Sequence, residues 1–270
     1  MDSSARKISV VVPAYNKGSI LFSALESLIR ETSLATQNFE IVVVNDGSED
    51  DTLEQALHFK KFNGYSDKIK IYHYPMNIGK GFALSYGFSR TSGDPVLFVD
   101  ADNDISFRNL RLALAYFDEY KADIIVGSKR HPKSQVQYPP IRRFYSALYQ
   151  AMIKFLFNLN VRDTQVGLKV FRRQVLEDVL PRLVVKAFAF DLELLVVARY
   201  LGYRKVVESP VFLNHGGISS SVNFAAARNI VMDTLGVFYR KVFLKYYDQK
   251  EAPSFQPSVG LVKRIQSTAV

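Results

Sequence analysis

Short runs of β-branched residues alternate with segments of helical periodicity through the first half of this chain. The first run, residues 8–12, contains only Ile and Val apart from one Ser, and Pro13 ends it. Similar runs, each separated from the next by a segment with apolar residues at helical spacing, follow at 40–44, 69–74, 95–99 and 124–126. Buried strands that alternate with helices predict an α/β domain whose mostly parallel sheet is flanked by helices on both faces.

Polar clusters follow four of these predicted strands. They occupy residues 13–17, 45–48, 100–104 and 127–130. In a parallel sheet, ligands bind in the crevice beyond the carboxyl ends of the strands. We therefore expect these four loops to form one site.

Two carboxylates, Asp100 and Asp102, flank a single residue directly after the apolar run 95–99, and Asp104 follows two positions later. Carboxylates at this spacing can converge on one divalent ion, which in turn binds a substrate diphosphate. A ligand set made only of oxygen favours Mg²⁺ or Mn²⁺ over zinc or copper. The alternative is an acidic turn without a ligand, because such turns are common.

Two other residues are suited to contact a nucleotide. Asp46 follows the predicted strand 40–44 and is placed to accept hydrogen bonds from a nucleobase or a ribose. Lys80 stands between two glycines at the start of a predicted helix, where anions are favoured. The glycine-rich run 77–81 is too short for a Walker A loop and lacks its Ser or Thr.

The positive charge of the chain is concentrated in one stretch. Between residues 128 and 173 there are ten Lys and Arg residues and one acid, which accounts for the whole formal net charge of +9. Such a patch predicts an anionic ligand, either phosphate, lipid headgroups or nucleic acid, and the alternative is a solvated basic surface. Because the chain has no Cys, a thiol nucleophile, a Cys-ligated zinc and an iron–sulfur cluster are excluded.

Residues 141–160 predict a strongly amphipathic helix inside this basic stretch. Its polar residues recur at intervals of four in one narrow stripe, and nearly all the others are large and apolar. Either this helix is buried against the sheet or a twin subunit, or it lies in a membrane interface with Arg142 and Arg143 at headgroup level. A second amphipathic helix is predicted at 225–247. No window of about 20 residues is apolar enough for a transmembrane helix, and residues 1–7 do not begin a signal peptide.

The order of the motifs resembles that of family 2 glycosyltransferases with the GT-A fold. The motifs are V-V-P-A-Y-N at 11–16, N-D-G-S at 45–48, N-I-G-K-G at 77–81 and D-A-D at 100–102. Three later runs are similar to the polyprenyl-phosphate sugar transferases, and most of all to the dolichyl-phosphate β-glucosyltransferase branch: G-S-K-R at 127–130, D-T-Q-V-G-L-K-V-F at 163–171 and F-A-F-D-L-E-L-L at 188–195. The resemblance spans about residues 7–215. It implies inverting transfer of a sugar from a nucleotide diphosphate to a membrane-embedded polyprenyl phosphate.

The resemblance also implies a role for each matching residue. The residues expected to bind the nucleotide-sugar donor are Pro13, Ala14, Tyr15, Asp46, Lys80, Asp100, Ala101, Asp102 and Gln165. The residues expected to bind Mg²⁺ or Mn²⁺ are Asp100, Asp102 and Asp104. The residues expected to act in catalysis are Asp102, Lys129, Arg130, Arg143 and Asp191, of which Arg143 would grip the acceptor phosphate. The residues expected to shape the sugar end are Asp163, Gln165, Asp191 and Glu193.

Three features depart from the family pattern. One is in the D-T-Q run, where Val166 and Leu168 replace the family's Cys and Phe and preserve apolar character. Lys17 replaces the acidic residue that usually follows Y-N, which puts a ribose contact in doubt. Lys129 replaces the Arg of G-S-R, so that it supplies charge without a bidentate fork.

Together, the motifs and the resemblance predict a peripheral enzyme on the cytoplasmic face of a membrane, with UDP-glucose as donor and a polyprenyl or dolichyl phosphate as acceptor. The alternatives are transfer of mannose or N-acetylglucosamine, or transfer to a sugar hydroxyl with Asp191 or Glu193 as the base. A non-catalytic module that binds lipid or nucleic acid is disfavoured by the D-A-D motif, and we expect no nucleic-acid partner. A twin subunit over helix 141–160 would make the protein a homo-oligomer.

The chain is expected to divide into three parts. Residues 1–215 form the GT-A domain, which includes the interfacial helix 141–160. Residues 216–248 form a lid and an amphipathic helix, and residues 249–270 form a flexible tail, because they are polar and rich in Ser, Gln and Pro.

Overall fold

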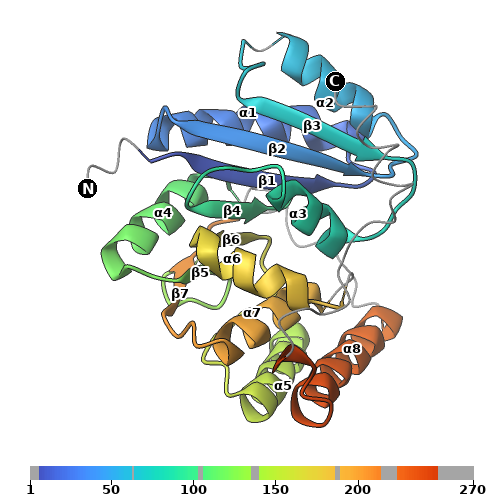
Figure 1. Ribbon diagram of the computed structural model, residues 1–270, viewed down its shortest axis with the longest axis vertical. Helices are drawn as coiled ribbons and strands as arrows, with labels where there is room; N and C mark the ends of the chain where they lie inside the picture. The colour runs from blue at the N-terminus through green and yellow to red at the C-terminus, as the bar shows by residue number, and fades with distance from the viewer. Residues whose placement is uncertain are drawn as a thin grey trace.

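The structure is a computed structural model that describes residues 6–62, 64–102, 106–134, 140–185, 189–213 and 224–248. Within those ranges, the side chains of residues 140–144 and 224–227 are not described. The described strands form one seven-stranded sheet in the order β3-β2-β1-β4-β6-β5-β7 (Figure 1). The strands are β1 (Ile8–Ala14), β2 (Phe39–Asp46), β3 (Ile69–Tyr74), β4 (Val96–Val99), β5 (Ile124–Ser128), β6 (Leu168–Phe171) and β7 (Val206–Pro210).

The sheet is parallel except at β6, which runs antiparallel between β4 and β5. The predicted mixed, mostly parallel sheet is therefore confirmed. The strand β6 itself was not predicted from the sequence, because it has only four residues and its apolar run is interrupted by Lys169. In the register of β4 and β6, Val99 lies opposite Leu168. This register brings the residue after β4, Asp100, beside the residue before β6, Gly167.

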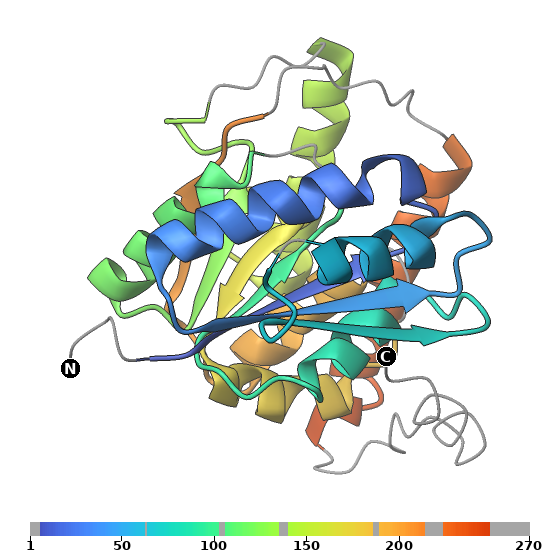
Figure 2. The same ribbon diagram turned by 90° about the horizontal axis from the view of Figure 1, so that it is seen from above.

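Helices cover both faces of the sheet (Figure 2). The helices are α1 (Gly18–Ala35), α2 (Thr52–Phe62), α3 (Lys80–Phe88), α4 (Arg108–Tyr120), α5 (Pro140–Phe157), α6 (Arg173–Val179), α7 (Phe190–Tyr200) and α8 (Phe224–Val242). Two 3₁₀ turns, η1 (Leu180–Arg182) and η2 (Tyr246–Asp248), follow α6 and α8. The short helix α6 was not predicted from the sequence.

The core is divided by the sheet into two apolar layers, because successive side chains of a strand point to opposite faces. In β1, Val10 and Val12 pack with the layer that includes α1 and α4, whereas Val11 packs with the layer that includes α3 and α7. The alternation continues into β6, where Phe171 belongs to the α7 layer. Lys169, two residues earlier, therefore points to the same side as α7.

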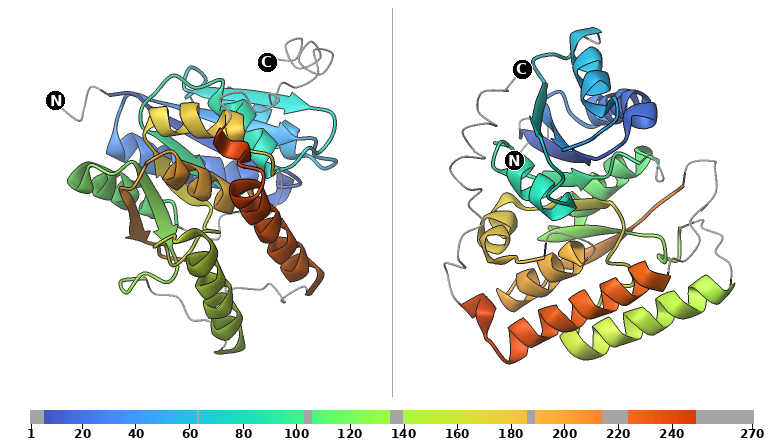
Figure 3. Two further views of the ribbon diagram at one scale, coloured as in Figure 1. Left: turned by 60° about the horizontal axis from the view of Figure 1, so that its bottom comes forward. Right: turned by 90° about the vertical axis from the view of Figure 1, so that its right-hand side faces the viewer.

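Helices α5 and α8 lie side by side beyond α7, as both views of Figure 3 show. Tyr149 of α5 and Thr234 of α8 share a hydrogen bond of 3.1 Å between their hydroxyl groups. The rings of Phe157 and Phe238 also meet, with centroids 6.1 Å apart. The inner face of α5 is buried at Phe157, which contributes to the α7 layer of the core.

The outer faces of α5 and α8 expose large apolar side chains. Phe155 of α5 is 87% exposed, and Met232 and Phe243 in and after α8 are 62% and 68% exposed. The predicted helix 141–160 thus has one buried face and one exposed apolar face, and it ends at Phe157, before Asn158 with its positive φ of 53°. Helix α8 likewise ends at Val242, earlier than the predicted residue 247. Among the described helices, none combines the length and the apolar character that a membrane span requires.

Candidate active site

The loops that follow β1 and β2 are joined by hydrogen bonds. The backbone N–H of Asn16 donates to Ser48 Oγ at 2.9 Å, and Asn16 Oδ1 accepts the N–H of Glu49 at 3.0 Å. Asn16 has a positive φ of 50°, which short polar side chains tolerate. Tyr15, at the same turn, is 41% exposed. The predicted donor-binding residues Pro13, Ala14 and Tyr15 therefore stand at the carboxyl end of β1, on a loop that is fixed to its neighbour.

Asp46, at the end of β2, is buried and faces the loop before α3. Its carboxylate accepts the backbone N–H of Ile78 at 2.9 Å and that of Gly79 at 3.0 Å. Burial raises the pKa of the Asp46 carboxyl, and these two hydrogen bonds oppose the rise. In this structure, Asp46 positions the loop that carries Lys80, and its contact with a nucleotide stays a prediction.

Gly47 allows this close approach of the two loops. Its φ of 64° is a conformation that residues with a side chain rarely adopt. A Cβ at this position would also lie 2.2 Å from the carbonyl carbon of Met76. Only glycine fits both requirements, so the N-D-G-S turn is specified by backbone geometry.

Four charged side chains from four different elements meet at the carboxyl end of β4, and we call them the charge cluster. Lys80 Nζ, at the start of α3, lies 2.8 Å from Asp100 Oδ1 and 3.4 Å from Asp191 Oδ2, at the start of α7. Lys169 Nζ, from β6, lies 2.7 Å from Asp191 Oδ1 and 2.8 Å from the carbonyl oxygen of Val166. The structure thus brings together three predicted site residues and one that was not predicted.

The charge cluster keeps Asp191 ionised. Burial alone would favour the neutral acid, but the ammonium groups of Lys169 and Lys80 outweigh it and lower the pKa of the Asp191 carboxyl. Burial acts against the charge of Lys80 as well, and the carboxylates of Asp191 and Asp100 raise the pKa of its ammonium group. A carboxylate with a lowered pKa is a weak base, so Asp191 is better suited to fix charge than to remove a proton.

Two glycines allow the cluster to assemble. Asp100 donates its backbone N–H to the carbonyl of Gly167 at 2.9 Å, and a Cβ on Gly167 would lie 2.1 Å from Asp100 Oδ2. A Cβ on Gly81 would lie 2.5 Å from the ring of Phe190. Glycine at these positions therefore lets β6 approach Asp100 and lets α7 approach α3.

The loop after β5 is tied to the D-T-Q run. Asp163 accepts the backbone N–H of Lys129 and that of Gln165, each at 3.2 Å, and burial raises the pKa of its carboxyl. Arg130 Nη1 donates to the carbonyl of Ser146 at 3.2 Å, which joins the same loop to α5. The loop that carries the predicted cations is thus connected to both the sheet and the amphipathic helix.

Some predicted residues lie elsewhere or outside the described ranges. Asp104 falls in the undescribed segment 103–105, and Arg143 lies in the first turn of α5, where side chains are not described. Ala101 is buried, directly between the two predicted carboxylate ligands. Glu193 does not join the charge cluster, because its carboxylate bonds to Arg240 and Tyr247 near the C-terminus.

Lys169 is the residue that sequence reasoning missed. No role was predicted for it, although it is 1% exposed and pairs directly with Asp191. A usable signal was present, because a lone Lys between the apolar residues of a strand must have a buried partner. The identity of that partner is set by tertiary packing.

The donor atoms near β4 suit a hard divalent cation. Asp100 and Asp102 offer only oxygen, and the carboxylate of Asp100 packs directly against Gly167, where no Cβ could be accommodated. Across the ranges given above, which exclude Asp104, no three His, Cys, Asp or Glu side chains are grouped as a metal site. The two described carboxylates are therefore compatible with the predicted Mg²⁺ or Mn²⁺ and do not complete a site for it.

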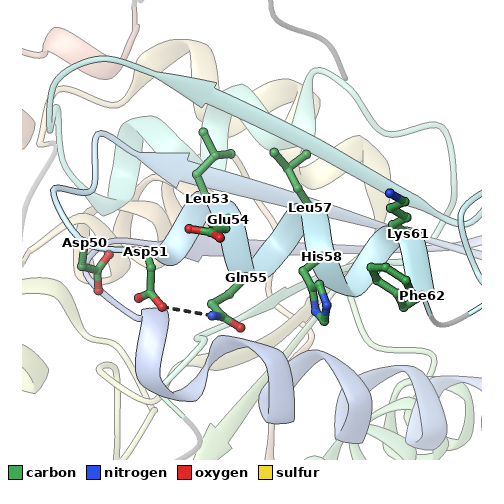
Figure 4. Close-up of a pocket in the computed structure, with 9 residues that line it drawn as sticks. All are labelled: Asp50, Asp51, Leu53, Glu54, Gln55, Leu57, His58, Lys61 and Phe62. Atoms are coloured by element: carbon green, nitrogen blue, oxygen red, sulfur yellow. Dashed lines mark hydrogen bonds between the residues drawn. The ribbon is translucent and has the colours of Figure 1, made fainter.

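A groove on α2 lies apart from this site (Figure 4). Its lining residues come from α2 and the turn before it, and they are Asp50, Asp51, Leu53, Glu54, Gln55, Leu57, His58, Lys61 and Phe62. Gln55 Nε2 donates to Asp51 Oδ2 at 3.0 Å, between two of these lining residues. None of the predicted site residues lines this groove, so we do not assign it to catalysis.

The sheet order, the single antiparallel strand and the clustered loops define an α/β domain of the GT-A class. A solved structure with the same fold is glucosyl-3-phosphoglycerate synthase from Mycobacterium tuberculosis in complex with Mn²⁺, UDP and phosphoglyceric acid. Its TM-score is 0.65 at 19% identity, over 87% of this chain and 79% of that one. Residues 9–180 match Glycosyl transferase family 2, and the chain belongs to this family.

Several curated relatives carry the name dolichyl-phosphate β-glucosyltransferase, among them one from Drosophila melanogaster and one from Mus musculus. The protein from Drosophila melanogaster is 35% identical over 214 residues, and that from Mus musculus is 31% identical over 212 residues. Each alignment covers 74% of this chain and 65% of the relative. The resemblance to this branch is confirmed, and the chain spans somewhat less than two thirds of the length of these relatives.

Proposed function

We propose that this protein transfers glucose from UDP-glucose to a polyprenyl phosphate such as dolichyl phosphate, with inversion at the sugar. The named relatives support the sugar and the acceptor, and the ionised state of Asp191 supports the class of acceptor. A phosphate acceptor is already ionised near neutral pH and needs no base, whereas a sugar hydroxyl does. The observation that carries the proposal is that Lys169 and Lys80 pair with Asp191, the carboxylate that a hydroxyl acceptor would require as its base.

The donor end of the site is assigned to the loops after β1, β2 and β4. The loop 13–15 and the segment positioned by Asp46 would hold the nucleotide, and Lys80 would contact the diphosphate. Asp100 and Asp102, with Asp104, would hold Mg²⁺ or Mn²⁺. When bound, the ion supplies charge neutralisation for the leaving diphosphate. The residues of this chain would orient the donor and keep its anomeric carbon accessible to the acceptor.

The acceptor end is assigned to the basic residues around the start of α5. Lys129 and Arg130 stand on the loop that Asp163 and Ser146 anchor. Arg142 and Arg143 open α5. Two anions, the acceptor phosphate and the donor diphosphate, must approach each other during transfer. Cations on the acceptor side reduce this repulsion and aim the phosphate.

The exposed apolar faces of α5 and α8 support attachment to a membrane surface that contains the lipid acceptor. Leu148 and Phe155 on α5 and Met232 on α8 are 61%, 87% and 62% exposed. A helix pair of this kind can lie in the interface and keep its basic residues at headgroup level. We place the protein as a peripheral enzyme on the cytoplasmic face, where nucleotide sugars are available.

The test is a transfer assay with detergent-solubilised polyprenyl phosphate, Mg²⁺ or Mn²⁺, and a panel of radiolabelled UDP and GDP sugars. Label that enters the lipid phase from UDP-glucose and is lost with EDTA is the expected result. Lipid label from GDP-mannose or UDP-N-acetylglucosamine would replace the proposed donor. Metal-dependent label on an oligosaccharide, without lipid label, would contradict the phosphate acceptor and favour Asp191 as a base.

A further inference from the structure

Glu193 forms the centre of a buried polar junction between α7 and the C-terminal part of the chain. It lies in the first turn of α7 and is fully buried. Glu193 Oε2 accepts the backbone N–H groups of Val184 and Val185 at 2.9 and 2.7 Å. Its Oε1 accepts Arg240 Nη2 at 3.1 Å and the Tyr247 hydroxyl at 2.6 Å. One carboxylate therefore joins α7 to the segment after η1, to α8 and to η2.

The same turn of α7 carries Asp191, two residues earlier. Asp191 points to the sheet, where Lys169 and Lys80 bind it, and Glu193 binds α8 and η2. The Glu193 N–H donates to the carbonyl of Ala189 at 2.8 Å, so the two acids share one rigid turn. A displacement of either carboxylate therefore shifts the backbone turn that also positions the other.

Arg240 links this turn to an exposed apolar surface. It lies in the last turn of α8, with Tyr239 beside it 53% exposed and Phe243 three residues on 68% exposed. Val237, one turn earlier, is fully buried in the layer that contains α7. Helix α8 thus holds Glu193 with one face and presents large apolar side chains with the other.

The junction depends on the position of α8. A buried carboxylate that loses its cation and a hydroxyl donor keeps the cost of its desolvation without the compensating interactions. If α8 moved away from α7, Glu193 would lose Arg240 and would either attract water or turn away. Each response would disturb the first turn of α7, which also positions Asp191.

We propose that Glu193 is a positioning residue that couples the seating of α8 to the geometry of Asp191. Catalysis then requires α8 to be docked, and a lipid surface beneath the apolar face of α8 favours that docked state. The dependence on lipid rests on the proposed function, because it places the acceptor lipid and the outer face of α8 in the same membrane. The coupling between Glu193 and Asp191 concerns only the folded chain.

The test compares Glu193→Gln with Glu177→Gln, which removes a carboxylate from an exposed ion pair with Arg173 on α6. For Glu193→Gln we expect kcat to fall by about 10-fold to 100-fold, as for a small misplacement of a catalytic group, with the donor KM within about twofold of wild type. Binding to vesicles of phosphatidylcholine and phosphatidylserine should stay unchanged. Stimulation of transfer by those vesicles should be lost. Glu177→Gln should match the wild type in every measurement.

Arg240→Lys and Arg240→Met give a second comparison that does not depend on the folding of the Glu193 variant. Lys keeps a positive charge opposite Glu193, so kcat should be several-fold higher for Arg240→Lys than for Arg240→Met. A Glu193→Gln protein with the kcat of Glu177→Gln would overturn the proposal. A loss of activity explained entirely by a higher donor KM would also overturn it, as would equal kcat values for the two Arg240 variants.

Failure of the proposed function would give a different experimental result from failure of the Glu193 proposal. A wild-type protein that transfers no sugar to polyprenyl phosphate would contradict the proposed function and not the role of Glu193. In that case the slow transfer of glucose from UDP-glucose to water supplies kcat for the same variants. The ratio of kcat for Glu193→Gln to kcat for Glu177→Gln then tests the positioning role of Glu193.

Discussion

Two parts of the site lie at the carboxyl ends of the strands: the loops after β1 and β2, and the charge cluster. They are stabilised by different kinds of interaction. In the loops, backbone N–H groups donate to fixed acceptors, as Asn16 does to Ser48 and Ile78 to Asp46. In the charge cluster, lysine side chains pair with carboxylates. The loops are therefore shaped before any ligand arrives, whereas a diphosphate or a metal ion must compete with the charges already present. On the proposed function, the donor side is preorganised, and the charge cluster has to exchange ion pairs when its ligands bind.

The largest effect is expected for Asp102→Ala. Removing this carboxylate takes away a predicted ligand of the ion that neutralises the leaving diphosphate, so transfer should fall by at least about 100-fold. The measurement is the initial rate of label transfer from UDP-glucose to polyprenyl phosphate. Binding of uridine by calorimetry is the control and should persist, because the loops after β1 and β2 are untouched. Retained turnover would contradict the metal assignment.

Breaking the buried ion pair should lower stability as well as activity. Lys169→Met leaves the buried carboxylate of Asp191 with a more distant cation, so the free energy of unfolding should fall by about 3–5 kcal/mol. Urea unfolding followed by circular dichroism measures this loss. Lys61→Met, at an exposed position of α2, is the matched control and should change stability little. Equal free energies of unfolding for the two variants would show that Lys169 is solvated in the folded protein.

Gly47, in the preorganised loops, and Gly64, between α2 and β3, have similar φ values and separate backbone strain from close packing. A Cβ on Gly64, which has a φ of 67°, would meet no atom within 4 Å, whereas a Cβ on Gly47, with a φ of 64°, would lie 2.2 Å from Met76. Gly64→Ala should cost about 1 kcal/mol of unfolding free energy from strain alone. Gly47→Ala should cost at least about 2 kcal/mol, since steric overlap is added. Thermal denaturation compares them, and a similar loss for both would mean that the two loops separate easily.

The smallest effect on transfer is expected for Arg143→Ala, at the start of α5. Loss of one charged hydrogen bond to the acceptor phosphate should raise the acceptor KM or lower kcat by roughly tenfold. Steady-state kinetics with varied polyprenyl phosphate test this. Nucleotide affinity should not change, because Arg143 is assigned to the acceptor side. A loss confined to nucleotide binding would move Arg143 to the donor side.

Sequence patterns predicted the elements that are long or strongly apolar. Strands β1 to β5, helices α1 to α5 and helix α8 were expected near their observed positions. The strand β6 and the helix α6 were missed, because they are short and β6 contains a buried Lys. The end of α8 was misplaced, since the amphipathic pattern continues past Val242 although the chain turns there.

The residue types of the site were predictable, and their pairing was not. The D-A-D motif identified Asp100, and the glycine-rich run identified Lys80. Nothing local to either segment indicates that they bind each other or that Asp191 joins them. Glu193 shows the same limit, because an acid two residues from Asp191 has the same local signal and points to a different part of the molecule.

The antiparallel strand β6 has a consequence for the order of assembly. Its pairing of Leu168 with Val99 closes a long excursion of the chain that includes α4, β5 and α5. Contacts between residues so far apart in sequence form slowly, because loop closure must precede them. During synthesis, the first four strands emerge well before β6 can supply Gly167 and Lys169. We therefore expect the loops after β1 and β2 to take shape early in folding, and the charge cluster to form only after β6 and α7 have packed in place.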